Sequence, residues 1–119
     1  MSRATNAVSS RRRRKRVLKK AKGYKGGRSR LFRTAVEAVR RGMAYSFAHR
    51  RKKKGDFRSL WIGRIKIAAN ERGLTYSRLI HGLNQVEIKL NRKMLADIAV
   101  YDPKGFDLIV KKVKDQEVS

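Results

Sequence analysis

Two runs of basic residues, at positions 11–16 and 50–54, carry the most distinctive chemistry in this sequence. An arginine side chain offers a planar fork of five N–H donors, which matches the oxygens of a phosphate group and also stacks on nucleobases. The alternatives are a solvated charged surface and a nuclear-localisation patch, but solvated surfaces ordinarily mix charges of both signs. The two runs therefore predict contacts with the phosphates of a nucleic acid.

The positive charge is concentrated in the first half of the chain. Residues 1–58 contain 22 Lys and Arg against two acids, Glu37 and Asp56, whereas residues 59–119 contain 11 basic and 7 acidic residues. The first half therefore carries +20 of the net charge of +24. Because a polycation of this density repels itself, it is stabilised by a polyanion, and the commonest cellular polyanion is nucleic acid. The composition favours RNA or DNA binding.

Most cations of the first 66 residues, together with one tyrosine, are candidate contacts. Tyr24 lies among glycines, where it can stack on an unpaired base. We expect Phe32 and Phe47 to pack on the apolar side of a helix instead, and His49 to contact phosphate or solvent. The predicted nucleic-acid-binding residues are Arg11, Arg12, Arg13, Arg14, Lys15, Arg16, Lys19, Lys20, Lys22, Tyr24, Lys25, Arg28, Arg30, Arg33, Arg40, Arg41, Arg50, Arg51, Lys52, Lys53, Lys54, Arg58, Arg64 and Lys66.

The sequence offers no constellation for catalysis or for a bound metal. It has no cysteine, its two histidines, His49 and His81, lack a second ligand at metal-binding spacing, and its carboxylates are scattered. The glycines of residues 23–27 lack the Gly-Lys-Ser/Thr ending of a phosphate-binding loop. We therefore predict that the protein is not an enzyme and needs no cofactor and no metal.

The basic first half of the chain is predicted to form an arm followed by a long helix. Residues 1–10 show no periodicity, and like charges four residues apart oppose a helix in residues 11–22, so we expect both segments to become ordered only on binding. Three glycines in residues 23–27 predict a flexible joint. From Ser29 onwards an amphipathic helix is predicted, with a kink or short break at residues 55–56. Its apolar stripe consists of Phe32, Val36, Val39, Met43 and Phe47.

The second half predicts a compact bundle of short helices. A helical pattern begins near Phe57 and ends near Gly73, a favoured C-terminal cap residue. Thr75 and Asn91 are predicted N-caps of two further helices, and residues 86–90 are predicted to be an extended connector. The last helix is predicted to follow a cap at Asp102 with proline at its first position.

These elements predict an all-α fold in two parts. Residues 1–58 are predicted to form a basic nucleic-acid-binding arm with a long amphipathic helix, and residues 59–119 a small α-helical globular domain. We expect Trp61 to belong to the core of that domain. The cations on the same helix, Arg58, Arg64, Lys66 and Arg72, are predicted to be exposed contacts.

Several short motifs keep a characteristic order and spacing along the chain. They are Lys22-Gly23-Tyr24 with Gly27-Arg28-Ser29-Arg30, then Phe57-Arg58-Ser59-Leu60-Trp61-Ile62 followed by Arg64-Ile65, then Tyr76-Ser77 with Gly82-Leu83, and Leu90-Asn91-Arg92-Lys93-Met94-Leu95-Ala96-Asp97. As a set, over about residues 11–113, they resemble the L-twenty family of bacterial large-subunit ribosomal proteins.

The resemblance implies a structural component of the large ribosomal subunit that binds 23S rRNA directly and is needed early in subunit assembly. It implies a basic arm that threads between RNA helices and a small domain that docks on an RNA junction beside neighbouring ribosomal proteins. It also implies, for some bacteria, repression of translation by binding to the protein's own mRNA. We therefore expect a cytoplasmic location on the bacterial ribosome rather than an organellar ribosome, no membrane partner and no homo-oligomer.

Charge alone leaves other functions open. A DNA-compacting protein would show the same cationic segment, because phosphate contacts do not separate RNA from DNA. A cationic, membrane-active protein could use the amphipathic helix predicted for residues 30–50. An organellar transit peptide is a further alternative for the start of the chain, although such peptides usually space their arginines rather than group them.

Overall fold

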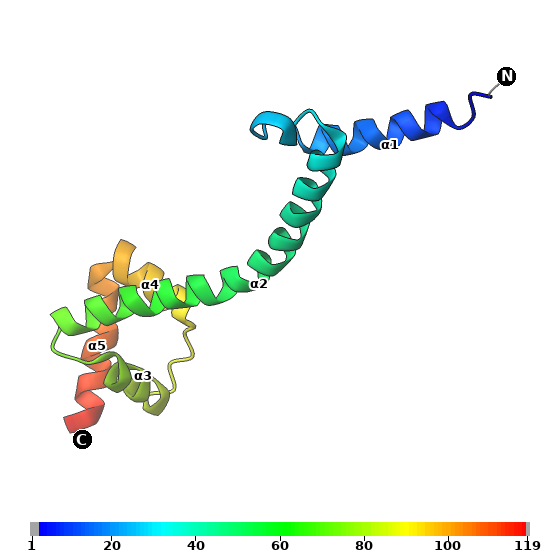
Figure 1. Ribbon diagram of the computed structural model, residues 1–119. Helices are drawn as coiled ribbons and strands as arrows, with labels where there is room; N and C mark the ends of the chain where they lie inside the picture. The colour runs from blue at the N-terminus through cyan, green and yellow to red at the C-terminus, as the bar shows by residue number, and fades with distance from the viewer. Residues whose placement is uncertain (1–2, 119) are drawn as a thin grey trace. The chain divides into compact units, whose positions relative to one another are not determined.

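The structure, a computed structural model, describes residues 3–118 and is all-α over that range, which confirms the predicted fold class (Figure 1). Five α-helices and one short 3₁₀ helix, η1, account for the regular elements in the described residues. In chain order they are α1 (Ala7–Lys20), η1 (Gly26–Arg28), α2 (Phe32–Glu71), α3 (Tyr76–Gln85), α4 (Arg92–Tyr101) and α5 (Pro103–Val118).

The chain divides into two compact units, Met1–Arg51 and Lys52–Ser119. We call them unit 1 and unit 2. The division falls within α2, which is helical from Phe32 to Glu71, so the kink or break predicted at residues 55–56 does not interrupt the helix. The sequence placed the boundary between an arm and a domain a few residues later, after residue 58, and that functional boundary stays a prediction.

The first helix of unit 1 corrects, for residues 7–20, the expectation that the start of the chain becomes ordered only on binding. Residues 7–20 form α1, whereas residues 1–2 lie outside the described range. Like-charge pairs four apart oppose a helix by only about 0.2–0.5 kcal/mol each. Val17, Leu18 and the buried Ala21 pack against Ala35 and Val39 of α2, and this apolar contact holds the C-terminal end of α1.

The glycine-rich segment after α1 is an ordered turn rather than a flexible joint. Gly23 and Gly26 adopt φ values of +86° and +61°, which a residue with a side chain rarely adopts. The Tyr24 amide donates to the Ala21 carbonyl at 3.1 Å, and the Thr34 hydroxyl donates to the Gly27 carbonyl at 2.9 Å. The second bond ties the turn to α2, which begins at Phe32 rather than near Ser29.

The predicted apolar stripe of α2 is largely uncovered in unit 1. Val39 is buried, but Phe32 is 38%, Met43 52% and Phe47 56% exposed. The expectation that Phe32 and Phe47 pack on the apolar side of the helix was therefore wrong, since both rings are exposed. Periodicity identified the apolar face of the helix correctly, but only the last turns of α1 are available to cover it.

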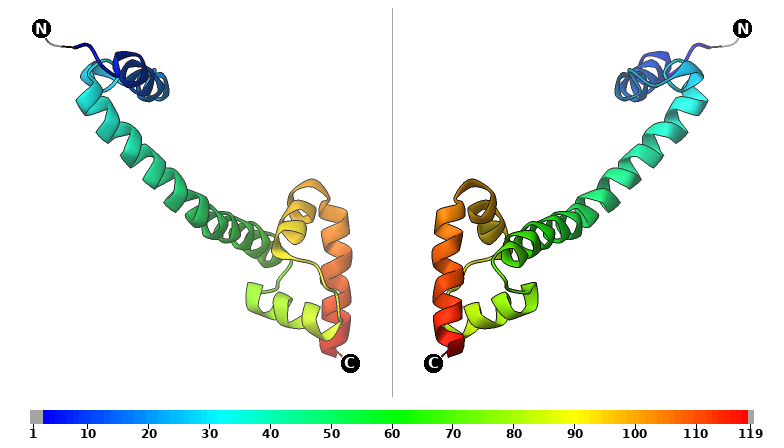
Figure 2. Two further views of the ribbon diagram at one scale, coloured as in Figure 1. Left: turned by 90° about the vertical axis from the view of Figure 1, so that its right-hand side faces the viewer. Right: turned by 90° about the vertical axis from the view of Figure 1, so that its left-hand side faces the viewer.

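Unit 2 has a continuous hydrophobic core built by its four helical segments. Ile65 from α2, Leu79 from α3, Leu95 from α4 and Phe106 from α5 are fully buried, and Trp61 is half-buried against them. Helix α5 packs against both α3 and α4 (Figure 2). The prediction that Trp61 packs on the core is confirmed.

The helix ends of unit 2 form as the sequence predicts. Gly73 ends α2 with φ +77°, and the Thr75 hydroxyl accepts a hydrogen bond from the Arg78 amide at 3.4 Å. The Asn91 side chain accepts from the Met94 amide at 2.8 Å, and the Asp102 carboxylate accepts from the Gly105 amide at 3.0 Å. Residues 86–90 connect α3 to α4 without regular structure.

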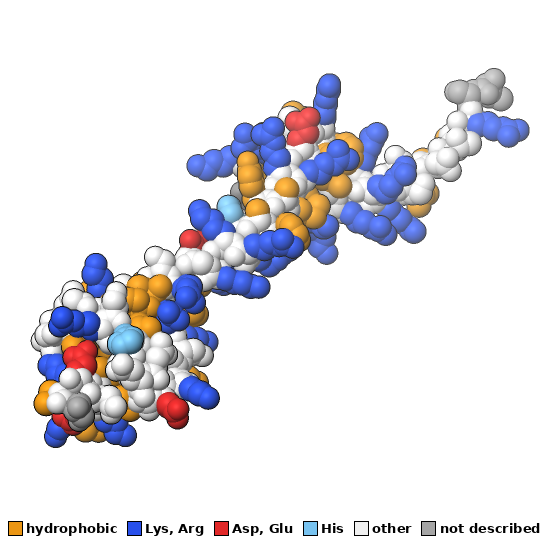
Figure 3. All heavy atoms as spheres, turned by 90° about the horizontal axis from the view of Figure 1, so that it is seen from below, with side chains coloured by type: hydrophobic (Ala, Val, Ile, Leu, Met, Phe, Trp, Pro, Cys, Tyr) orange, Lys and Arg blue, Asp and Glu red, His pale blue; other side chains and the backbone are white. Residues whose placement is uncertain are grey.

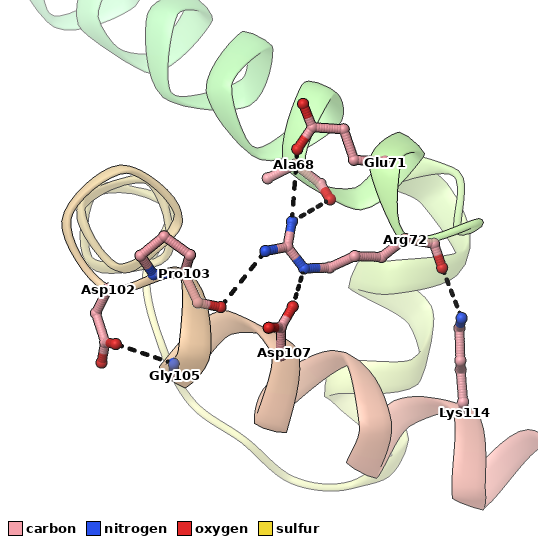
Figure 4. A network of polar contacts seen from close by, with 8 residues as sticks. All are labelled: Ala68, Glu71, Arg72, Asp102, Pro103, Gly105, Asp107 and Lys114. Atoms are coloured by element: carbon pink, nitrogen blue, oxygen red, sulfur yellow. Dashed lines mark hydrogen bonds and ion pairs between the residues drawn. The ribbon is translucent and has the colours of Figure 1, made fainter.

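Arg72 is part of the fold rather than an exposed contact, which corrects the sequence-based prediction (Figure 4). Its guanidinium group donates to the Ala68 carbonyl at 2.8 Å and to the Asp107 carboxylate, and it lies 5.0 Å from the centre of the Phe106 ring. Its own carbonyl accepts from the Lys114 ammonium group at 2.6 Å. Arg72 therefore ties the end of α2 to α5.

Candidate nucleic-acid interface

All 24 predicted contact residues are exposed. Helix α1 carries Arg11, Arg12, Arg13, Arg14, Lys15, Arg16, Lys19 and Lys20, and the turn with its flanks carries Lys22, Tyr24, Lys25, Arg28 and Arg30. The part of α2 in unit 1 carries Arg33, Arg40, Arg41, Arg50 and Arg51, and the part in unit 2 carries Lys52, Lys53, Lys54, Arg58, Arg64 and Lys66.

The cations of unit 1 have almost no counter-charge within their own unit. Residues 1–51 contain 18 Lys and Arg and one acid, Glu37. Within residues 3–118 the ion pairs join Arg72 to Glu71 and Asp107, and no cation of unit 1 takes part in one. Lys and Arg side chains greatly outnumber acidic side chains on the face shown in Figure 3. The cationic groups of unit 1 are therefore available to an external polyanion.

Helix α1 matches the charge density of a nucleic acid. Its six consecutive cations at residues 11–16 follow the helical rise of about 1.5 Å per residue. Double-stranded DNA carries one phosphate charge per roughly 1.7 Å of its axis. Because consecutive helical side chains point around the axis, α1 can contact phosphates on more than one side, as a helix between two nucleic-acid strands or helices requires.

Exposed aromatic rings lie beneath several of these cations. The Arg14 guanidinium lies 5.5 Å from the centre of the Phe32 ring, and the Arg51 guanidinium lies 4.7 Å from that of Phe47. The Lys53 ammonium group lies 5.6 Å from the Phe57 ring centre. Each pair presents a flat apolar surface and a positive charge together, which suits a base and its phosphate.

Two of these aromatic residues were missed as contact candidates, although the sequence contains a signal for them. Phe47 precedes Arg51 by four residues and Lys53 precedes Phe57 by four, the spacing at which side chains meet on one helix. Phe47 was expected to pack on the apolar side of the helix, and Phe57 was placed at the start of a separate helix. Neither ring is buried in the structure.

Two of the grooves of unit 1 combine such side chains from α2 with residues of α1 or of the glycine-rich turn. The smaller, of about 270 Å³, lies between α1 and α2 and is lined by Val17, Lys20, Phe32, Arg40 and Met43 among others. The larger, of about 730 Å³, lies between the glycine-rich turn and α2. Both combine apolar or aromatic side chains with cations, an arrangement that can hold an unstacked base next to its phosphates.

Two further kinds of feature, a metal-binding cluster and a membrane-spanning helix, are not found in the described residues. No group of three or more His, Cys, Asp or Glu side chains in residues 3–118 is placed to hold a metal ion. None of the described helices is long and apolar enough to cross a lipid bilayer.

Comparison with known proteins identifies the family. The sequence profile described as "Ribosomal protein L20" matches residues 3–109. The chain belongs to this family. A protein named "Large ribosomal subunit protein bL20" from Syntrophotalea carbinolica is 57% identical over 116 residues, which cover 98% of each chain.

Further relatives with the same name support the assignment to the L20 family. The Chlamydia muridarum protein is 54% identical over 114 residues, covering 96% of this chain and 93% of its own. The Geobacter sulfurreducens protein is 53% identical over 116 residues, covering 98% and 99%. These L20 relatives are structural proteins of the ribosome rather than enzymes, as the sequence predicted for this chain, and the resemblance seen in its motifs is confirmed.

Proposed function

We propose that this L20 protein binds 23S rRNA directly, mainly through unit 1, and acts early in the assembly of the large ribosomal subunit. The observation that carries the proposal is the charge of unit 1, in which 18 exposed or partly exposed cations face a single acid and form no ion pair within the described residues. Membership of the L20 family selects the RNA of the large subunit over other polyanions.

Neutralisation of phosphate repulsion is the proposed mechanism. Junctions in a large RNA bring phosphates close together, and their repulsion opposes folding of the RNA. Residues 11–16 and 50–54 place eleven cations where such phosphates can be contacted. Since fixing the backbone of one residue costs about 1–2 kcal/mol, a helix that is already formed in α1 reduces the ordering cost of binding.

In this proposal, unit 2 is the part of the chain that recognises the shape of the RNA. Its core fixes the surface from which Arg58, Arg64 and Lys66 project, and all three side chains are exposed. Duplex RNA is recognised mainly through its shape and backbone. We propose that unit 2 docks on an RNA junction and that neighbouring large-subunit proteins adjoin it there, on a ribosome in the bacterial cytoplasm.

Reconstitution of the large subunit tests the assembly role. Subunits assembled from purified rRNA and proteins without this chain are expected to stop at an early intermediate, and addition of the chain is expected to restore normal yield. Normal yield without the chain, at physiological magnesium and temperature, would contradict the assembly role.

A competition assay tests the choice of RNA over DNA. Binding of the chain to a large-subunit RNA junction is expected to resist competition by random duplex DNA. If about ten phosphates are neutralised, the logarithm of the affinity should fall with the logarithm of salt concentration with a slope of about −7 to −9. Equal affinity for both nucleic acids would favour a DNA-compacting protein.

Repression of the protein's own messenger stays a prediction of the family resemblance. The RNA-facing residues proposed in unit 2, Arg58, Arg64 and Lys66, would serve either RNA. A translational reporter that carries the leader of this messenger should be repressed by extra L20 protein and relieved by free 23S rRNA. An unrepressed reporter would remove this regulatory role and leave the ribosomal role intact.

A further inference from the structure

The larger of these two grooves of unit 1 contains an acidic side chain, Glu37, that phosphate binding does not explain. This groove, of about 730 Å³, lies between the glycine-rich turn and one face of α2. We call it the tyrosine groove. The turn contributes Tyr24, Lys25 and Arg28, and α2 contributes Glu37, Arg41 and Tyr45.

Glu37 is the unexpected member, since it is the single acid of residues 1–51. It precedes Arg41 by four residues, the favourable spacing and order for an ion pair on a helix. Nevertheless, the Glu37 carboxylate has no ion pair and no hydrogen bond within the described residues. A free carboxylate repels phosphate and, when ionised, accepts hydrogen bonds without donating any. It therefore suits a ligand that presents N–H donors.

The two tyrosines supply flat surfaces beside this carboxylate. Tyr45 stacks with His49, with ring centres 5.9 Å apart and ring planes inclined by 13°. The Tyr24 hydroxyl lies close to α2, 3.4 Å from the position that a Cβ atom would take on Gly42. Tyr24 and Tyr45 are 38% and 59% exposed, which leaves ring surface on which an unpaired base can stack.

The carboxylate selects among the four RNA bases by the pattern of donors on their pairing edges. Guanine presents two neighbouring donors, N1–H and the N2 amino group, which together match the two oxygens of one carboxylate. Adenine and cytosine each present one amino group beside an acceptor nitrogen, and uracil presents one N–H between two carbonyl groups. The best match to an acceptor-only side chain is guanine.

We infer that the tyrosine groove binds an unpaired guanine of the RNA, with Glu37 as the base-reading residue. The guanine stacks on tyrosine, its N1–H and N2 amino group donate to the Glu37 carboxylate, and Lys25, Arg28 and Arg41 bind the phosphates of adjacent nucleotides. The inference rests on the proposed RNA-binding function and adds base selectivity to it. An arginine from a neighbouring protein would also offer donors to Glu37, but the three cations at the groove favour a ligand that is negatively charged overall.

Short RNA oligomers of defined sequence test the base preference directly. The full chain is titrated with labelled nine-nucleotide RNAs made of uridine, with guanosine, adenosine, cytidine, inosine or uridine at the central position, and binding is followed by fluorescence anisotropy at fixed salt. All five carry the same phosphates. The guanosine oligomer is expected to bind about tenfold more tightly than the uridine oligomer. Inosine, which lacks the N2 amino group, is expected to lose about threefold relative to guanosine.

Two matched variants separate the base-reading role of Glu37 from the general effect of its negative charge. Glu37→Gln and Asp56→Asn each convert one exposed acid of the basic half of the chain to its amide, but only Glu37 lines the tyrosine groove. Both variants are expected to bind all oligomers slightly more tightly, because each adds one unit of net positive charge. The preference for guanosine over uridine is expected to fall to about twofold or less in Glu37→Gln and to remain about tenfold in Asp56→Asn.

Failure of this inference differs from failure of the proposed function. Equal binding of all five oligomers, or an unchanged guanosine preference in Glu37→Gln, would overturn the guanine site and leave RNA binding standing. The absence of binding to every oligomer and to large-subunit rRNA would overturn the proposed function as well. Because the inosine oligomer changes no residue of the protein, the result does not depend on how well a variant folds.

Discussion

The two units of this L20 protein are stabilised in different ways. Eleven buried residues form the core of unit 2, whereas the buried cluster of unit 1 consists of Ala21, Ala35 and Val39. Full burial of a side chain such as valine contributes only about 1.5–3 kcal/mol, so the core of unit 1 is small against the repulsion of its 18 cations. We expect unit 2 to fold through its own core, and unit 1, which is folded but has little buried apolar surface, to be stabilised further by a polyanion.

The largest effect is expected from removal of the cations of α1. Substitution of all six basic residues at positions 11–16 by Gln should reduce the slope of log affinity against log salt by about 4–5 and weaken rRNA binding by about 10³-fold or more. Filter binding to 23S rRNA across a salt series measures both quantities. The control substitutes Lys104, Lys111 and Lys112 of unit 2 by Gln. An equal loss of rRNA affinity per cation there would contradict the proposed difference between the two units.

Loss of the core of unit 2 should cost most of its stability. Phe106 is fully buried and is one of the largest side chains in the unit 2 core, so Phe106→Ala is expected to lower the free energy of unfolding by about 3–5 kcal/mol. Denaturant titration followed by the fluorescence of Trp61, the single tryptophan, measures the change. In contrast, Val39→Ala in unit 1 should leave the denaturant midpoint of the Trp61 transition unchanged. A shift of that midpoint would show that the two units unfold together.

Loss of the Arg72 contacts should have an intermediate effect, which is confined to the stability of unit 2. Arg72→Gln removes the contacts to Asp107 and the Phe106 ring and is expected to destabilise unit 2 by about 1–2 kcal/mol, since the side chain is 18% exposed but its carboxylate partner is 59% exposed. The salt slope of rRNA binding should stay unchanged. A slope reduced by about one unit would instead place Arg72 among the phosphate contacts.

The smallest effect is expected at a helix cap of unit 2. Asn91→Ala removes the side-chain acceptor of the Met94 amide and should destabilise unit 2 by about 1 kcal/mol, while Asn91→Asp should retain most of the stability. The midpoints of thermal unfolding of the three proteins give the comparison. Loss of rRNA affinity in Asn91→Ala at a temperature where it is fully folded would show that this cap also belongs to the RNA-binding surface.

Features that depend on neighbouring residues could be predicted from the sequence. The caps at Thr75, Asn91 and Asp102 were predicted because each side chain reaches an amide only three residues further along. The exposure of the candidate cations also follows from local composition, since the basic first half of the chain has too few apolar residues to bury them.

Features that depend on distant residues could not be predicted in the same way. Helix α1 is held by Ala35 and Val39, which lie beyond the turn, and the partner of Arg72 is Asp107, 35 residues away. The periodicity of α2 located an apolar face, but it did not show that no other helix covers Phe47. The tyrosine groove was missed because the glycine-rich turn brings Tyr24 and Glu37 to one groove, although they lie 13 positions apart in the sequence.

A crosslinking map in purified large subunits tests the central claim most directly. Ultraviolet crosslinking followed by mass spectrometry identifies the residues of this chain that contact RNA within the assembled particle. We predict that most RNA crosslinks fall within residues 11–54, with Tyr24 among them. Crosslinks confined to residues 74–118, with none in residues 11–54, would contradict the assignment of unit 1 as the main rRNA-binding part of the chain.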